Sequence, residues 1–345
     1  MSDLILTAAA LLLLAACVLY KAKFHPGENP DFFNIPNTNA LRGIWSIVVI
    51  LVHIPPERGN LIQDMIGSFG FVAVTFYFLF SGYGLSLGVL RKGFTGKGFW
   101  TKRLPKLLVP QLVVNILAVV LLWVLLGDQP TLSNLLLIAG WTKWLLACYL
   151  VFQLAHLLFR DPKKANIAIG LSLGAISLSM YTLSRLGVVT ATIWPTEIWG
   201  FLWGILLALY FPRFRIFGKD RWLLKTLLAC ALSGCLGLLY LKFKPIVFWG
   251  DYLLKIALGC AIIGFVLLLN MRFSIGNRIL ACLGSISYEV YLVHSPVIVL
   301  IARALPELSS GPFILLSLAG TIAASLIVHR LADGLLKKIH PLTKA

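Results

Sequence analysis

Charged residues are scarce in this sequence. They make up 12% of its 345 residues, whereas 59% are hydrophobic and the mean hydropathy is +0.91. Soluble globular domains carry about 25% charged residues, so this composition excludes an ordinary soluble domain. Most of the surface must face lipid or neighbouring lipid-facing helices. The sequence therefore predicts an all-α, polytopic integral membrane protein of the cell inner or plasma membrane.

Acidic residues are the scarcest charged class, with 13 Asp and Glu against 30 Lys and Arg, a formal net charge of +17. In a soluble protein this excess would suggest nucleic acid, but here the basic residues cluster in short connections between apolar runs. That distribution is typical of the positive-inside rule. It predicts membrane lipid as a partner and no nucleic acid.

Several familiar catalytic and metal-binding patterns are also missing. None of the six cysteines forms a CxxC pair, so neither a zinc site nor a disulfide framework is indicated. The sequence has no Walker loop, no HExxH and no GxGxxG that leads out of a strand. We therefore expect no metal, and redox, phosphoryl-transfer and zinc-hydrolase functions are poorly supported.

Long apolar runs are what the sequence does have, and about eleven of them approach the roughly 20 residues that a bilayer requires. The first, within residues 1–24, lacks a basic n-region and indicates a retained transmembrane helix rather than a signal peptide. The eleven predicted segments are 3–20, 38–56, 68–90, 107–127, 144–160, 165–183, 193–211, 222–241, 246–270, 279–304 and 311–332.

The distribution of basic residues among the loops predicts the orientation. The connection 91–106 holds six basic residues and no acid, and 212–225 is similarly rich, whereas 305–310 holds only Glu307. Basic loops belong in the cytoplasm. With eleven spans, the N-terminus is then expected outside and the tail 333–345 in the cytoplasm.

Arg42 and His53 lie eleven residues apart in one apolar stretch. At about 100° per helical residue, their side chains would point in directions that differ by only roughly 20° around the helix. The two residues would lie about 16 Å apart along the helix axis. Ionisable groups on an otherwise apolar membrane helix indicate a functional site. The alternative is an Arg at the membrane edge and a hydrogen-bonded packing His.

The third and tenth predicted segments also carry polar residues. Ser81 is followed by Gly82, but Leu79 stands where a nucleophile elbow needs glycine, so a packing or substrate-contact role is expected. Gly84 and Gly88 form a small-xxx-small pair, which predicts close helix packing.

In the tenth segment, Ser287, Tyr291 and His294 share one helical face, which indicates either a lined cavity or a polar packing seam. Glu289 falls near mid-membrane and must be protonated or partnered. Glu197 is expected at the outer end of the seventh segment.

Read in order, these patterns resemble the membrane acyltransferase 3 family, which includes bacterial O-antigen O-acetyltransferases. The resemblance covers 38–332 as a ten-helix core, with 1–24 as an extra N-terminal helix, and departs from the family pattern at Leu145. The matching stretches are Leu41-Arg42-Gly43 with His53, Phe78 to Tyr83, Phe99 to Pro110 with Arg103, Lys143-Trp144-Leu145, Glu197 to Ala208, and Ser287 to His294.

The resemblance implies an O-acyltransferase that moves an acyl group, expected to be acetyl, from cytoplasmic acyl-CoA to a hydroxyl of a carbohydrate or lipid-linked glycan of the cell surface. This chemistry needs a base and a clamp for the phosphates of the donor. His53 is the expected general base and Arg42 the donor clamp. The further expected donor-binding residues are Arg103, Ser81 and Tyr83, and the expected acceptor or cavity-lining residues are Glu197, Tyr288, Glu289, Tyr291 and His294.

The alternative is an exporter or flippase component for a polysaccharide or lipid, without acyl transfer. Intramembrane His, Glu and Arg suit transport equally well on physical grounds. Transporters often contain internal inverted repeats, but the Arg42–His53 pattern has no counterpart in the second half of the chain. A pure transporter would release no free CoA from acetyl-CoA, which separates the two classes.

Overall fold

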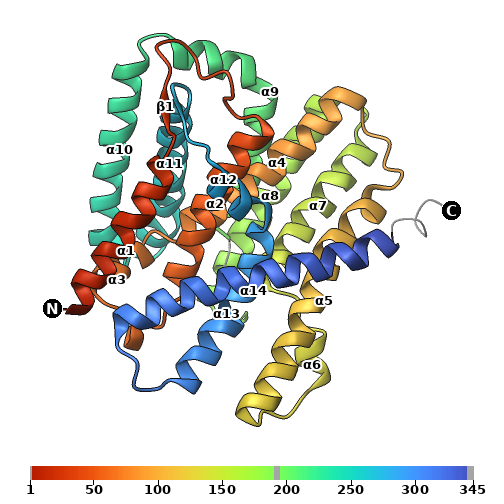
Figure 1. Cartoon of the computed structure of the whole chain (residues 1–345). Coiled ribbons are helices and arrows are strands. Elements are labelled where there is room, and N and C mark those ends of the chain that lie inside the picture. The colour runs from red at the N-terminus through yellow and green to blue at the C-terminus, as the bar shows by residue number, and fades with distance from the viewer. Residues whose placement is uncertain (1, 190–194, 340–345) are drawn as a thin grey trace.

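The computed structural model describes residues 2–189 and 195–339, which are almost entirely helical (Figure 1). The elements are α1 (Ser2–Leu19), β1 (Lys23–Phe24), α2 (Ile35–Val52), η1 (Pro56–Arg58), α3 (Leu61–Gly67), α4 (Phe71–Lys92), α5 (Phe99–Leu126), α6 (Leu132–Leu135), α7 (Gly140–Leu158), α8 (Pro162–Arg185), α9 (Trp199–Lys219), α10 (Trp222–Phe243), η2 (Trp249–Leu254), α11 (Lys255–Asn270), β2 (Phe273–Ser274), α12 (Arg278–Ser285), α13 (Ser287–Ala304) and α14 (Ser310–Ile339).

The helices are those of a multi-pass membrane protein. Within the described residues, eight helices are long and apolar enough to cross a bilayer, or nine if the bent pair α12 and α13 forms one span. Two further predicted segments coincide with α1 and α7, helices of 18 and 19 residues. The all-α polytopic fold is therefore confirmed, while the count of eleven spans stays a prediction.

Several predicted boundaries differ from the observed ones, and three of the differences concern α5, α14 and α9. Helix α5 begins at Phe99 rather than at 107, because the basic turns before the apolar run are already helical. Helix α14 continues to Ile339, so the first part of the predicted tail is helical, and 340–345 lie outside the described residues. The seventh predicted segment starts at 193 but α9 starts at Trp199, with 193 and 194 outside the described part.

The predicted single segment 279–304 is two helices, α12 and α13, which bend by 73° at Ile286. Helix α12 is pressed against α2: a Cβ on Gly284 would lie 1.8 Å from the backbone oxygen of Asn39. Hydropathy alone does not reveal this bend because both halves are apolar. The bend sets the direction of α13, which carries residues 287–294.

Helices α4 and α9 also pack backbone to backbone, but through different glycines from those expected. A Cβ on Gly204 would lie 2.1 Å from Leu79 O, whereas Gly84 and Gly88 have nothing within 4 Å of the same position. The prediction that Gly84 and Gly88 form the packing pair is therefore wrong. Two small residues four positions apart identify a helix face on which another helix could pack closely. Only the position of the neighbouring helix decides whether that face is used.

We expect Gly204→Ala to lower the stability of the protein, because its methyl group would collide with the backbone of α4. Overpacking of this kind costs about 1–3 kcal/mol. Gly84→Ala is the matched control, since it adds the same methyl group to open space in α4. Thermal unfolding in detergent should show a lower Tm for Gly204→Ala alone, and equal Tm values would contradict this account.

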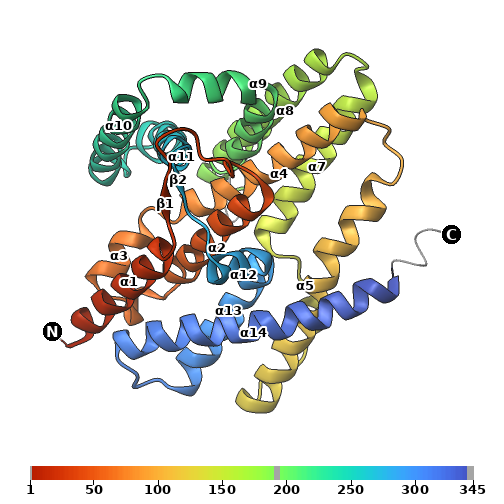
Figure 2. The same ribbon diagram turned by 45° about the horizontal axis from the view of Figure 1, so that its top comes forward.

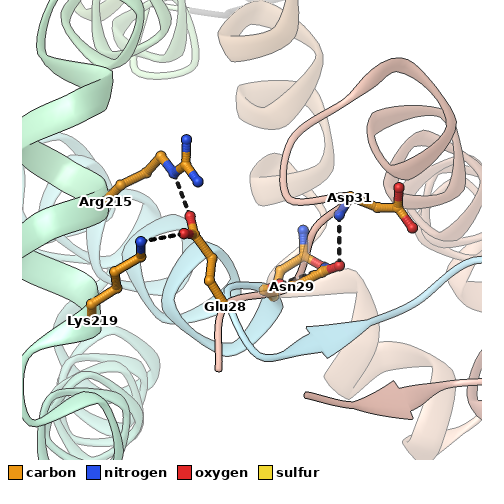
Figure 3. Close-up of polar contacts among 6 residues, drawn as sticks. Glu28, Asn29, Asp31, Arg215 and Lys219 are labelled. Carbon is orange, nitrogen blue, oxygen red and sulfur yellow. Dashed lines mark hydrogen bonds and ion pairs between the residues drawn. The ribbon is translucent and has the colours of Figure 1, made fainter. Parts of the chain in front are cut away.

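The segment after α1 is fastened to the rest of the fold at two places. β1 pairs antiparallel with β2, with Lys23 opposite Ser274, and the strands lie side by side in Figure 2. The carboxylate of Glu28 binds Arg215 and lies 2.6 Å from the Nζ of Lys219, both in α9 (Figure 3). The hydrogen bond from Arg215 holds the pKa of Glu28 below its ordinary value. The segment that leads from α1 into α2 is therefore attached to both β2 and α9.

This anchor should depend on pH. A carboxyl whose pKa is depressed in the folded state contributes stability above its unfolded pKa of about 4.3 and loses that contribution as the pH falls through the folded pKa. We therefore expect Glu28→Gln to have a lower Tm than the unsubstituted protein at neutral pH, with the two values converging under acidic conditions. A difference in Tm that is independent of pH would contradict the role of the charge.

Candidate functional site

A first cavity, of about 220 Å³, surrounds the side chain of Arg42; we call it the Arg42 cavity. Arg42 forms no ion pair within the described part of the chain, and neither does Lys106, which also lines the cavity. The cavity is therefore electropositive and without a fixed counter-charge. Its lining consists of Arg42, Tyr77, Ser81, Lys106, Leu107, Trp141, Leu145, Tyr149, Ser287, Tyr288 and Tyr291.

A second cavity, of about 480 Å³, lies at the end of α2; we call it the His53 cavity. His53 is exposed. His294, which is buried, lies beside it, and the centroids of the two rings are 4.4 Å apart. The lining consists of His53, Gln111, Val114, Asn115, Ala118, Val119, Leu122, Asp128, Gln129, Asn134, Leu137, Ala139, Gly140, Tyr291, Leu292, His294, Ser295, Pro296 and Val299.

Backbone carbonyls select the tautomers of the two histidines. The Nδ1 of His53 lies 2.8 Å from Val49 O, and the Nδ1 of His294 lies 3.3 Å from Val290 O. A carbonyl oxygen only accepts, so in the neutral rings Nδ1 must carry the proton. The Nε2 atom of each ring then holds a free lone pair. At His53 this lone pair belongs to a ring that is exposed in the cavity, as a general base requires.

Tyr291 lines both cavities and so lies at their junction. Its hydroxyl oxygen accepts a hydrogen bond of 3.2 Å from the backbone N–H of Trp141, and the two rings lie 5.3 Å apart. Because the oxygen accepts this bond, the hydroxyl proton remains available to a further acceptor. Tyr291 is only 9% exposed, so it is largely shielded from solvent.

His53 lies at the end of α2 rather than within a longer helix. The predicted segment ran from 38 to 56, but α2 ends at Val52 and His53 is its C-cap. Pro55 and Pro56 follow closely, and proline disfavours continuation of a helix. Arg42 and His53 therefore serve two cavities along one helix instead of one continuous stripe.

The structure separates the expected donor-binding residues. Ser81 lines the Arg42 cavity and donates to Tyr77 O over 2.9 Å. Tyr83 instead packs edge-on against Phe33, with centroids 4.7 Å apart, and is absent from the lining of this cavity.

Arg103 also lies off the lining of the Arg42 cavity. Its guanidinium lies over the ring of Phe99, 4.0 Å from the centroid, and donates to Phe99 O. Lys106, one helical turn further along α5, does reach the cavity. Sequence reasoning missed Lys106 because every lysine in the basic connection has the same topological explanation.

The expected acceptor or cavity-lining residues divide in a similar way. Tyr288, Tyr291 and His294 line the cavities. Glu197 instead pairs with Lys255, 2.6 Å away, and Glu289 pairs with the Nδ1 of His329, 2.8 Å away. Both carboxylates are buried, so an unpartnered charge would be costly. His329 is the partner that Glu289 was predicted to need. Glu197 and Glu289 line neither cavity, so the expectation that they do is wrong.

One wall of the His53 cavity was missed altogether. Gln111 donates to the Oδ1 of Asn115 over 2.9 Å, and the Nδ2 of Asn115 donates to Leu137 O over 2.7 Å. These amides attach the segment after α6 to α5. The sequence does contain a signal for this wall: Gln111 and Asn115 lie four residues apart in an apolar run, a spacing that places their side-chain amides on one helical face.

An ion pair links the C-terminal ends of α5 and α13 near this wall. Asp128 lines the His53 cavity, and its two carboxylate oxygens bind Arg303 at 2.5 and 2.8 Å. This hydrogen bonding by Arg303 lowers the pKa of Asp128.

Within the described residues, no group of His, Cys, Asp and Glu side chains is placed to hold a metal ion.

Comparison with known proteins gives one match. The family model described as an acyltransferase domain, acyltransferase 3, matches residues 35–330, from the start of α2 into α14. No curated protein and no solved structure matches the chain. The matched range includes every residue that lines the two cavities.

Proposed function

The chain belongs to the membrane acyltransferase 3 family, and we propose that it is an O-acyltransferase with cytoplasmic acyl-CoA as donor. The acyl group is acetyl, and the acceptor is a hydroxyl of a cell-surface carbohydrate or lipid-linked glycan. One observation carries the proposal: an electropositive cavity and a cavity with an exposed histidine meet at Tyr291. Donor and acceptor would approach from the two cavities, and the acyl group would pass between them at the junction.

The Arg42 cavity suits the donor. Coenzyme A carries several phosphate charges, and an arginine fork binds phosphate with two parallel hydrogen bonds. Arg42 and Lys106 supply two cationic groups that no carboxylate neutralises within the described residues. With the phosphates there, the thioester would extend toward Tyr291.

The reaction then follows from the groups at the junction. The Nε2 of His53 takes the proton of the acceptor hydroxyl, and the hydroxyl oxygen attacks the thioester carbonyl carbon. The hydroxyl of Tyr291 donates to the developing oxyanion, as a positioned hydrogen-bond donor does in acyl transfer. A carbon–oxygen bond forms, the carbon–sulfur bond breaks, and the CoA sulfur leaves with the proton that His53 returns.

We propose further that all eleven segments cross the membrane, with the N-terminus outside and the C-terminus in the cytoplasm. The connection between α9 and α10 and that between α4 and α5 lie at the upper end of Figure 1 and are rich in basic residues. The connections from α5 to α6 and from α13 to α14 lie at the lower end. The positive-inside rule then assigns the upper end to the cytoplasm. Reporter fusions at these four connections would test the assignment.

The decisive experiment for the proposal uses purified protein in lipid nanodiscs with acetyl-CoA. We expect release of free CoA thiol above the protein-free background. An exporter or flippase component would release none, and that result would overturn the proposal. Mass spectrometry of surface glycans from cells with and without the protein would then identify the acylated hydroxyl.

Arg42→Lys should weaken acetyl-CoA binding about tenfold, the equivalent of ~1.4 kcal/mol, because lysine keeps the charge but loses the fork geometry. Arg103→Lys is the matched control, since Arg103 lies outside the lining of the cavity. Calorimetric titration of both variants with acetyl-CoA measures the difference. Equal weakening in both would show that the donor does not bind specifically at Arg42.

A further inference from the structure

An apolar groove of about 240 Å³ runs between α5, α13 and α14. All of its lining residues are apolar. Leu121 of α5 is 46% exposed and Ile327 of α14 is 57% exposed, so the groove is open at an apolar part of the molecular surface. The lining consists of Val114, Leu117, Ala118, Leu121, Leu122, Val293, Pro296, Val297, Leu300, Ala324, Ile327 and Val328.

The groove is continuous with the His53 cavity and separate from the Arg42 cavity. Val114, Ala118, Leu122 and Pro296 line both the groove and the His53 cavity. The groove and the Arg42 cavity have no lining residue in common. A hydrocarbon chain in the groove would therefore lead to the His53 cavity without passing the place where the donor would bind.

We infer that the groove holds the hydrocarbon chain of the acceptor, whose hydroxyl-bearing head lies in the His53 cavity. The inference rests on the proposed function and narrows the acceptor to an amphiphile, a sugar carried on a lipid. The polar side of the cavity, with Asp128, Gln129 and Asn134, suits such a head, and the apolar groove suits only its chain. A freely soluble sugar would leave the groove unused.

The groove would contribute to catalysis by positioning the acceptor rather than by adding binding free energy. A chain that arrives from the bilayer leaves one apolar environment for another, so the transfer itself adds little binding free energy. Fixing the chain confines the head near His53, which raises the effective concentration of the hydroxyl. The acyl chain of the donor is a poorer occupant, because the donor cavity does not adjoin the groove.

Photo-crosslinking in phosphatidylcholine nanodiscs tests the inference without requiring acyl transfer. One probe is dodecyl glucoside with a diazirine in its chain, and the other is phosphatidylcholine with the same diazirine. Leu121→Trp fills the groove from an exposed position on α5, and Ala324→Phe fills it from α14. Leu125→Trp is the matched control, because Leu125 is exposed one turn further along α5 and lies outside the groove.

We expect the glucoside to label α5, α13 and α14 around the groove in the unsubstituted protein and in Leu125→Trp. Labelling should fall about tenfold in Leu121→Trp and Ala324→Phe, the equivalent of ~1.4 kcal/mol. Glucoside labelling that is spread over the lipid-facing helices like that of phosphatidylcholine would indicate ordinary bilayer lipid only and overturn the inference. So would undiminished labelling in both groove-filling variants.

A thioester assay keeps this test distinct from that of the proposed function. Acetyl-CoA hydrolysis without acceptor should be unchanged in the control Leu125→Trp, because Leu125 lines neither the groove nor the Arg42 cavity. Absence of hydrolysis in the unsubstituted protein counts against the proposed function, whatever the crosslinks show. Normal hydrolysis with unspecific crosslinks counts against the groove alone.

Discussion

His53→Ala should abolish acyl transfer while the protein still folds, inserts and binds acetyl-CoA. Loss of a positioned general base costs about 10²-fold to 10⁴-fold in rate. Donor binding should survive, because a base acts mainly in the transition state and His53 lies outside the lining of the Arg42 cavity. The measurements are acceptor acylation by mass spectrometry and calorimetric titration with acetyl-CoA.

His156→Ala is the matched control for this variant. His156 also lies on an apolar helix, α7, but it packs against the ring of Phe152 and lines neither cavity. It should retain acyl transfer. Undiminished transfer by His53→Ala would refute the assignment of the base. Equal loss of donor binding in His53→Ala and Arg42→Lys would show instead that the two cavities act as one binding unit.

Tyr291→Phe should slow turnover about 10²-fold to 10³-fold, the effect of removing one donor to an oxyanion. The substitution keeps the ring at the junction and removes only the hydroxyl, so acetyl-CoA affinity should change little. The rate at saturating donor measures the first effect, and calorimetric titration measures the second. Loss of donor affinity with an unchanged rate would show that the hydroxyl only helps to shape the cavity.

Tyr288→Phe provides the comparison within the same helix. The hydroxyl of Tyr288 donates to Leu107 O over 2.8 Å, so its proton is already engaged. Removing this hydroxyl should therefore slow turnover much less than Tyr291→Phe, although Tyr288 lines the Arg42 cavity. Equal rate losses in the two variants would argue against a specific role for the Tyr291 hydroxyl.

The residues around the junction show how far local sequence patterns lead. The spacing of Ser287, Tyr291 and His294 predicted one polar helical face, and these residues do lie along the two cavities. Glu289 was also expected among the acceptor or cavity-lining residues, but it pairs with His329 of α14 and lines neither cavity. Helical periodicity places a residue on a face, but it does not identify the element that this face meets.

The sequence by itself determined the class of the protein and the position of nearly every apolar helix, and it singled out Arg42 and His53 as candidate site residues. These features follow from hydropathy and from the cost of ionisable groups in lipid, which are local properties. Only the tertiary structure separated Arg42 and His53 into two cavities, placed Tyr291 between them and joined the His53 cavity to an apolar groove. The reason is that each cavity is lined by helices far apart in sequence, and their contacts depend on side-chain packing that no single segment encodes.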